Sequence, residues 1–319
     1  MRYSRRREKT TVLSRKRGEA VEELKINQIS KRTNLILELL MGLIALCTAL
    51  PVVLVIIISF SSEQSIFEKG YSFFPAELSL KGYEFFLKLG DQLVKSYGIT
   101  IFVTIVGTTI SLTVTALFAY VISRQDYLFR KPLTFLMLFT MLFNGGMVPA
   151  YMINTQLLHL GDSIWALILP MTINAYYIIV LRTFYRSIPM EIIEAARIDG
   201  SSEFNTFVKI VLPLSKPGIA TIGLFTMITY WNDWFSGMLY MMDNRKYPVQ
   251  TLLWSMQNSL EAMKASSANA LEYAEMARNA PTESGRMALT VLVILPILLA
   301  YPFFQKYFVK GLTIGGVKG

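Results

Sequence analysis

Cysteine, histidine and charged residues are all scarce in this chain. Its 319 residues include one cysteine, Cys47, and one histidine, His159. A single cysteine excludes an intramolecular disulfide and a cysteine cluster for a metal ion. A lone histidine beside a turn is more often structural than a ligand or a base. We therefore expect neither a metal site nor a catalytic site.

The low charge content points to a membrane protein. Charged residues make up 17% of the chain, hydrophobic residues make up 53%, and the mean hydropathy is +0.44. A soluble domain of average composition has about 25% charged residues. A water-soluble fold is therefore a poor match to this sequence.

Six long stretches lack Asp, Glu, Lys and Arg, and about 20 apolar residues suffice for a helix to cross the hydrocarbon core. We expect an all-α membrane protein with six transmembrane helices and with a basic tail over residues 1–34 before a transmembrane domain over 35–319. The fifth helix runs on past Asp233. The expected spans are about 35–60, 96–123, 132–155, 163–185, 214–240 and 287–306.

Lysine and arginine are unevenly distributed between the loops. Of 31 such residues, 22 lie in the two tails, in the loop 124–131 and in the segment 182–216. The positive-inside rule places these regions, and hence both termini, in the cytoplasm. The net charge of +9 is then a topological signal. We expect the lipid bilayer, and no nucleic acid, as the partner of the basic tail.

The outer loops, 61–95 and 241–286, are longer than joining two helices requires. The first contains the amphipathic stretch SLKGYEFFLKLGDQLVKS, and the second contains the helix-favouring stretch LEAMKASSANALEYAEMARNA. We interpret them as a surface for an external partner. Ordinary connectors are the alternative.

One cytoplasmic segment, 187–213, is polar and helix-forming between two apolar spans. Ser187 as a cap, Pro189 in the first turn and Gly200 as a stop predict a short helix. Ser201 or Ser202 can cap a second helix, which Pro213 ends. The predicted packed faces are Ile188, Ile192, Ala195 and Ala196 in the first helix, and Phe204, Phe207, Val208 and Val211 in the second.

The other side of the first helix is predicted to carry Glu191, Glu194 and Arg197. The small alanines at its shoulder would let another protein approach the backbone closely. A loop that merely caps the helical bundle is the alternative reading.

This segment resembles the EAA motif of ABC-importer permeases. The pattern is Glu-Ala-Ala, three residues, Gly, nine residues, and Ile-x-Leu-Pro, and all seven positions are present. FNGGMVPAYM, LRTFYRSIP and YWNDWF make the chain similar to the carbohydrate branch, which is MalG-like, and within it to the LplC and YtcP type of oligosaccharide permease. The resemblance implies these ATPase-coupling residues: Glu194, Ala195, Ala196, Arg197, Asp199, Gly200, Ile210, Leu212 and Pro213.

The resemblance further implies a type I ABC-importer permease fold, with a coupling helix around Glu194, in the cytoplasmic membrane of a Gram-positive bacterium. The implied partners are a second permease in a heterodimer, a cytoplasmic ABC ATPase dimer and an extracellular solute-binding lipoprotein. No cofactor is expected in this chain, since ATP and Mg would be bound by the ATPase. Consistently, the chain has no Gly-Lys dipeptide, which a phosphate-binding loop of the Walker type requires.

Polar and aromatic residues in two spans are candidates for the substrate pathway. Asp233 stands out because an ionisable residue inside a span is expensive and suggests function. Aromatic faces with neighbouring carboxylates and amides suit sugars. An aromatic belt at the outer interface is the competing interpretation. The candidates are Asn174, Tyr176, Tyr177, Tyr230, Asn232, Asp233 and Trp234.

Two other functional classes fit the sequence less well. An ion-coupled secondary carrier would need no ATPase and usually shows internal repeats and buried ionisable pairs. An intramembrane enzyme would need clustered catalytic residues, which one histidine and one cysteine hardly supply.

Overall fold

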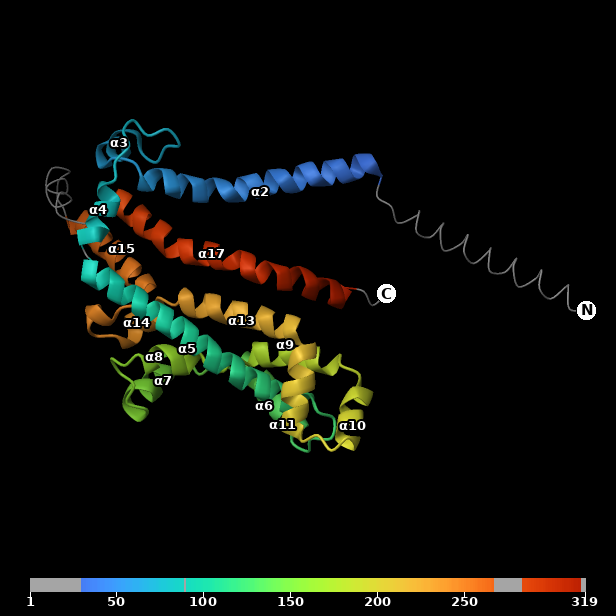
Figure 1. Cartoon of the computed structure of the whole chain (residues 1–319). Coiled ribbons are helices and arrows are strands. Elements are labelled where there is room, and N and C mark those ends of the chain that lie inside the picture. Colours follow the sequence, from blue (N-terminus) through green and yellow to red (C-terminus); the bar gives the residue numbers. More distant parts are fainter. Residues whose placement is uncertain (1–29, 89, 267–282, 317–319) are drawn as a thin grey trace, which may run out of the picture. The chain divides into compact units, whose positions relative to one another are not determined.

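The computed structural model describes residues 30–88, 90–266 and 283–316 (Figure 1). These residues form helices and one isolated β-bridge, between Ser61 and Leu78. The helices are α2 (Lys31–Ser59), α3 (Glu63–Lys69), α4 (Lys81–Lys88), α5 (Gly90–Ser123), α6 (Arg130–Leu142), α7 (Met147–Met152), η1 (Ile153–Leu157), α8 (Trp165–Ile168), η2 (Leu169–Met171), α9 (Ala175–Arg186), α10 (Met190–Ile198), α11 (Glu203–Thr206), η3 (Phe207–Val211), α12 (Leu212–Leu214), α13 (Lys216–Trp231), α14 (Phe235–Tyr240), η4 (Asn244–Lys246), α15 (Val249–Ser266) and α17 (Glu283–Gly316).

The chain divides into two units, Met1–Leu54 and Val55–Gly319. The described part of the first unit is most of α2, which is apolar along its length. The site described below lies wholly in the second unit. Most of the basic tail, and residues 267–282 of the helix expected in the outer loop, fall outside the described residues.

Two helices are long and apolar enough to cross a membrane, Arg32–Ser59 and Gly90–Ser123. The number rises to five if each of three bent helix pairs is one span. The last expected span, 287–306, lies within α17. The all-helical prediction is therefore confirmed for the described residues, and the number of spans stays a prediction.

The breaks fall at polar or glycine-containing stretches. Within the expected span 132–155, the chain bends by 114° between Leu142 and Met147. Gly146 has a φ of +89° there, a conformation that side chains with a β-carbon rarely adopt. The span 163–185 bends by 51°, and the fifth helix ends at Trp231 instead of continuing to Tyr240. Hydropathy depends only on apolar content, so the sequence predicts a single span for each of the first two bent pairs.

Helix α5 is the centre of the second unit. It packs most extensively against α13 and α9, and Figure 1 shows α5 running beside α13. The cytoplasmic half of its buried surface, as assigned from the loop charges, includes Ala119, Tyr120 and Ile122. Residues from α9, α10 and η3 complete this cluster, so the EAA segment (187–213) is packed onto the end of α5.

A glycine allows the close approach of α5 to α13. A β-carbon at Gly107 would lie 2.7 Å from ring carbons of Tyr230. The Tyr230 side chain is 3% exposed, and its hydroxyl donates a hydrogen bond to the carbonyl oxygen of Ile168 at 2.9 Å. The ring cannot swing aside without losing that bond, so this contact fixes the two helices against each other.

Loops that the charge pattern assigns to the same side of the membrane contact each other. In the lysine- and arginine-rich set, the loop after α5 contacts the EAA segment. In the other set, Lys246 forms an ion pair with Asp162. The Glu63 carboxylate accepts a hydrogen bond from the amide of Ser284 at 2.6 Å, at the start of α17. Each contact joins loops that the charge pattern places on one side of the membrane.

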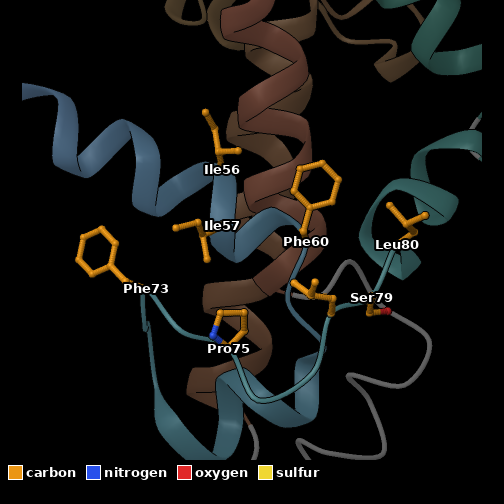
Figure 2. Close-up of a pocket in the computed structure, with 8 residues that line it drawn as sticks. Ile56, Ile57, Phe60, Phe73, Pro75, Ser79 and Leu80 are labelled. Atoms are coloured by element: carbon orange, nitrogen blue, oxygen red, sulfur yellow. The ribbon is translucent and has the colours of Figure 1, made fainter.

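An apolar hollow of about 690 Å³ lies where α2 meets the following loop (Figure 2). Ile56, Ile57 and Phe60 line it from the helix, and Phe73, Pro75, Leu78, Ser79 and Leu80 line it from the loop. Only Ser79 brings a side-chain hydroxyl. A sugar needs several hydrogen-bonding partners, so this hollow does not suit a carbohydrate.

The close approach at Gly107 predicts an asymmetry between two glycines of α5. Gly107→Ala should lower the free energy of unfolding by about 1–3 kcal/mol, because the added methyl group overpacks the Tyr230 ring. Gly98→Ala is the matched control, since a β-carbon there meets no atom within 4 Å. It should be neutral or stabilising by up to about 1 kcal/mol. Equal unfolding midpoints of the two variants in detergent would contradict the packing described.

Candidate functional site

The bend at the centre of the EAA segment is a complete helix C-cap. Helix α10 ends at Ile198, and Gly200 follows in the left-handed region with a φ of +77°. The amide of Ser201 donates to the carbonyl of Ala196 at 2.9 Å, and the amide of Gly200 donates to that of Arg197 at 3.0 Å. This is the Schellman arrangement, in which a glycine ends a helix and turns the chain. The predicted stop at Gly200 is confirmed.

The flanking caps are partly as predicted. The Ser202 side chain accepts a hydrogen bond from the amide of Asn205 and caps α11, as expected. Ser187, however, ends α9, and Pro189 immediately precedes α10. The second helix passes through a π-helical turn, η3, and includes Pro213, so the bend before α13 falls at Ser215. Proline is tolerated in this short α12 because it lies in the first turn.

The packed face of α10 is rotated by about one residue from the predicted one. Ile193 and Ala196 are buried, whereas Ile192 and Ala195 are exposed. Ile193 was not predicted because it adjoins an equally apolar Ile192, and apolar spacing cannot choose between the two. Glu191 and Glu194 are exposed, as predicted.

Large apolar side chains are exposed on both sides of the Gly200 bend. In the second helix only Phe207 and Val211 of the predicted stripe are buried. Phe204 is 69% exposed, and Ile198, the last residue of α10, is 86% exposed. Of the remaining motif residues, Asp199 and Pro213 are exposed, and Ile210 and Leu212 are half-buried. Exposed apolar side chains gathered next to exposed carboxylates are typical of a protein-binding surface.

Arg197 turns towards its own chain. Its guanidinium donates to Asp126 at 2.5 Å and to Glu203 at 2.6 Å. Arg124 contacts the same two carboxylates, at 3.3 Å and 3.8 Å. The Tyr120 hydroxyl donates to Glu203 at 2.8 Å. We call these five residues the bend network, because they join the loop after α5 to both sides of the Gly200 bend.

Contacts within the bend network shift the pKa values of three of its charged side chains. The hydrogen bond from Arg197 lowers the pKa of Asp126 below its usual value. Partial burial tends to raise the pKa of Glu203, but the Tyr120 hydroxyl and the two arginines outweigh burial and lower it. Hydrogen bonds to Asp126 and then Glu203 raise the pKa of Arg197. Asp126, Glu203 and Arg197 are therefore ionised at neutral pH.

Three of the candidate pathway residues have structural roles. Tyr230 is buried against Gly107. The Asn174 side chain accepts a hydrogen bond from the amide of Tyr177 at 3.3 Å and caps α9. The Asp233 carboxylate accepts a hydrogen bond from the amide of Ser236 at 3.1 Å, at the start of α14. Of the two tyrosines, Tyr177 stacks on Phe225, while Tyr176 is 56% exposed.

Asn232 and Trp234 are exposed and meet two residues that sequence reasoning missed. The Gln250 side chain donates to the Asn232 side-chain oxygen at 3.1 Å. The rings of Trp234 and Trp254 stack, with centroids 5.4 Å apart. Gln250 and Trp254 are one helical turn apart in α15, and this spacing is a sequence signal that the two side chains share one face of the helix. We call these four residues the tryptophan platform.

Residues 106–314 match the family described as "Binding-protein-dependent transport system inner membrane component". The chain belongs to this family. It is 41% identical over 277 residues to the polygalacturonan/rhamnogalacturonan transport system permease protein YtcP of Bacillus subtilis, covering 86% of this chain and 94% of that protein. It is 39% identical over 282 residues to Protein LplC of the same organism, covering 88% and 93%.

One solved structure shares the fold. It is the crystal structure of a bacterial ABC transporter involved in the import of the acidic polysaccharide alginate, with a TM-score of 0.74 and 29% sequence identity. The match covers 88% of this chain and 99% of the other. The type I ABC permease fold and the resemblance to sugar ABC permeases are thereby confirmed.

The charges of the bend network predict a pH-dependent contribution to stability. Because the pKa of Asp126 is lowered in the folded protein, its contribution is present above about pH 4 and is lost as the pH falls. Asp126→Asn should therefore destabilise the protein at pH 7 and have less effect at pH 3. The difference at pH 7 should be about 1 kcal/mol or less, because solvent screens this half-exposed carboxylate. The measurement is the unfolding midpoint of the wild-type protein and of Asp126→Asn between pH 3 and pH 7. A stability difference that does not change with pH would contradict the prediction.

Proposed function

We propose that this protein is one transmembrane permease subunit of an ATP-driven importer for a carbohydrate, specifically an oligosaccharide derived from a polysaccharide. The observation that carries the proposal is a complete EAA motif on an exposed helix, α10, in a chain of the permease family. The similar proteins named above supply the substrate class, since one is a polygalacturonan/rhamnogalacturonan permease and another imports alginate. The ion-coupled carrier finds no support among them.

In this proposal α10 is the coupling helix. The exposed carboxylate of Glu194 pairs with an arginine of a cytoplasmic ATPase subunit, and the small Ala195 lets that subunit approach closely. Exposed Ile198 and Phe204 supply the apolar part of the contact. ATP and Mg are bound by the ATPase dimer, so this chain holds no cofactor. Closure of that dimer displaces α10 and opens the bundle towards the outside.

The proposed topology has six spans with both termini in the cytoplasm of a Gram-positive bacterium's plasma membrane. The bend network joins loops of the cytoplasmic set, and the Asp162–Lys246 ion pair joins loops of the outer set. A second permease completes the pathway as a heterodimer. The outer segments 61–95 and 241–286 face a solute-binding lipoprotein.

The tryptophan platform is the proposed substrate surface of this subunit. Trp234 is 39% exposed, and Asn232 and Gln250 offer amide groups for sugar hydroxyls. Aromatic stacking with a few placed amides is the usual chemistry of carbohydrate recognition. Asp233 is occupied as a helix cap, so we assign it a structural role.

A bulky residue on α10 should prevent ATPase association. Ala195→Trp adds an indole at the proposed point of close approach, and it should abolish copurification of the ATPase from the native host while membrane insertion is unchanged. Ala76→Trp is the matched control, because Ala76 is also exposed but lies in the outer segment. Normal ATPase recovery with Ala195→Trp would exclude α10 as the docking helix.

Loss of the exposed tryptophan should weaken uptake without affecting assembly. Trp234→Ala should raise the half-saturating concentration of polygalacturonan fragments by about three- to tenfold, the effect of about 0.7–1.4 kcal/mol of lost stacking. Trp165→Ala is the control, since Trp165 is 46% exposed on another helix. Equal effects of the two substitutions in vesicles containing the whole importer would place the substrate elsewhere.

A further inference from the structure

Apart from the bend network, helix α10 has a narrow packed face. Of its nine residues, Ile193 and Ala196 are buried, and half-buried Met190 packs against the core cluster that includes Ile193. A contact this narrow is one on which a short helix can rock. The bend network adds a second attachment, through the Arg197 guanidinium, on the side of α10 next to the bend.

The bend network reaches a rigid part of the protein. Arg124, whose side chain is 7% exposed, directly follows α5, and its guanidinium lies 5.9 Å from the centre of the Tyr120 ring. The Tyr120 ring packs 5.0 Å from that of Phe207 in the core. A force applied to α10 through Arg197 therefore acts on the end of α5, the helix against which α9 and α13 pack.

The ion pairs of the bend network are better suited to transmitting a displacement of α10 than to stabilising the fold. Single ion pairs at a surface contribute only about 0–1 kcal/mol, because solvent screens them and side-chain entropy opposes them. A planar guanidinium that donates to two carboxylates nevertheless fixes direction, which a lysine cannot do. The arrangement thus adds little stability while defining the position of α10 relative to α5.

We propose that Asp126 and Arg197 are a positioning pair that transmits the displacement of the coupling helix to α5. This inference rests on the proposed function, and it gives Arg197 a role inside the subunit in place of contact with the ATPase. If the pair is broken, the ATPase still docks on α10 and still hydrolyses ATP, but α10 rocks on Ile193 without moving α5. Hydrolysis and uptake then become uncoupled.

The test measures uptake of polygalacturonan fragments per ATP hydrolysed, in vesicles that contain the complete importer. Asp126→Asn and Arg197→Gln should each lower this ratio at least about threefold, with the ATPase recovered at the wild-type level. The double variant should be no worse than the poorer single variant, because two changes that break one interaction are not additive. Arg197→Lys keeps the charge without the planar fork, and it should give an intermediate ratio.

Asp91→Asn is the matched control. It removes a carboxylate that pairs with Lys95 at 2.5 Å on an exposed part of the outer segment, and it should leave the ratio unchanged. Glu203→Gln tests the bend network from the other side of the Gly200 bend, should Asp126→Asn fail to insert. It should also lower the ratio, since Glu203 joins Arg197 to Tyr120.

Three results would overturn the inference: an unchanged ratio with both Asp126→Asn and Glu203→Gln, additive losses in the double variant, or loss of the ATPase from the complex. The last result would assign the bend network to docking or folding. Failure of the proposed function looks different, because wild-type protein would then yield no ATPase on purification and no ATP-dependent uptake.

Discussion

Unpaired backbone amides and carbonyls cannot be left in a hydrocarbon environment, and this constraint applies wherever a helix within a span is interrupted. At the interruptions after α6, η2 and α13, an asparagine or aspartate side-chain oxygen accepts a hydrogen bond from an amide near the start of the next helix. Asn144 accepts from Gly146 at 2.9 Å, Asn174 accepts from Tyr177, and Asp233 accepts from Ser236. Polar residues in these spans therefore allow the helices to bend, which explains why two residues considered for substrate binding have become caps.

Helix α5 connects the bend network to the start of the tryptophan platform. The bend network reaches the C-terminal end of α5 at Tyr120 and Arg124. Further along α5, Gly107 contacts Tyr230 near the end of α13, immediately before the break that exposes Asn232 and Trp234. Packed interiors transmit displacement because they deform little. In the proposed mechanism, a movement of α5 therefore reaches the tryptophan platform through α13 and Tyr230.

The sequence predicted those features that depend on neighbouring residues. The bend at Gly200 and the Ser202 cap follow from local backbone chemistry, and both are present. The pairing of Arg197 with Asp126 joins residues 71 positions apart, so no local pattern contains it. The stacking of Trp254 on Trp234 likewise depends on how α15 folds back. The exposure of Ile192 was missed because two adjacent isoleucines offer the helix two nearly equivalent packed faces.

The exposure of apolar residues indicates a binding surface in the EAA segment but not along the membrane spans. Along the membrane spans they can face lipid, which makes their exposure uninformative about partners. The EAA segment also carries Glu191, Glu194 and Lys209, all exposed, and charged side chains of this density require water or a partner of opposite charge. Lipid is therefore excluded as the cover for Ile198 and Phe204, and water is unfavourable for both. This combination of side chains is the basis for proposing that a second protein, with an apolar groove and a basic residue, covers the EAA segment.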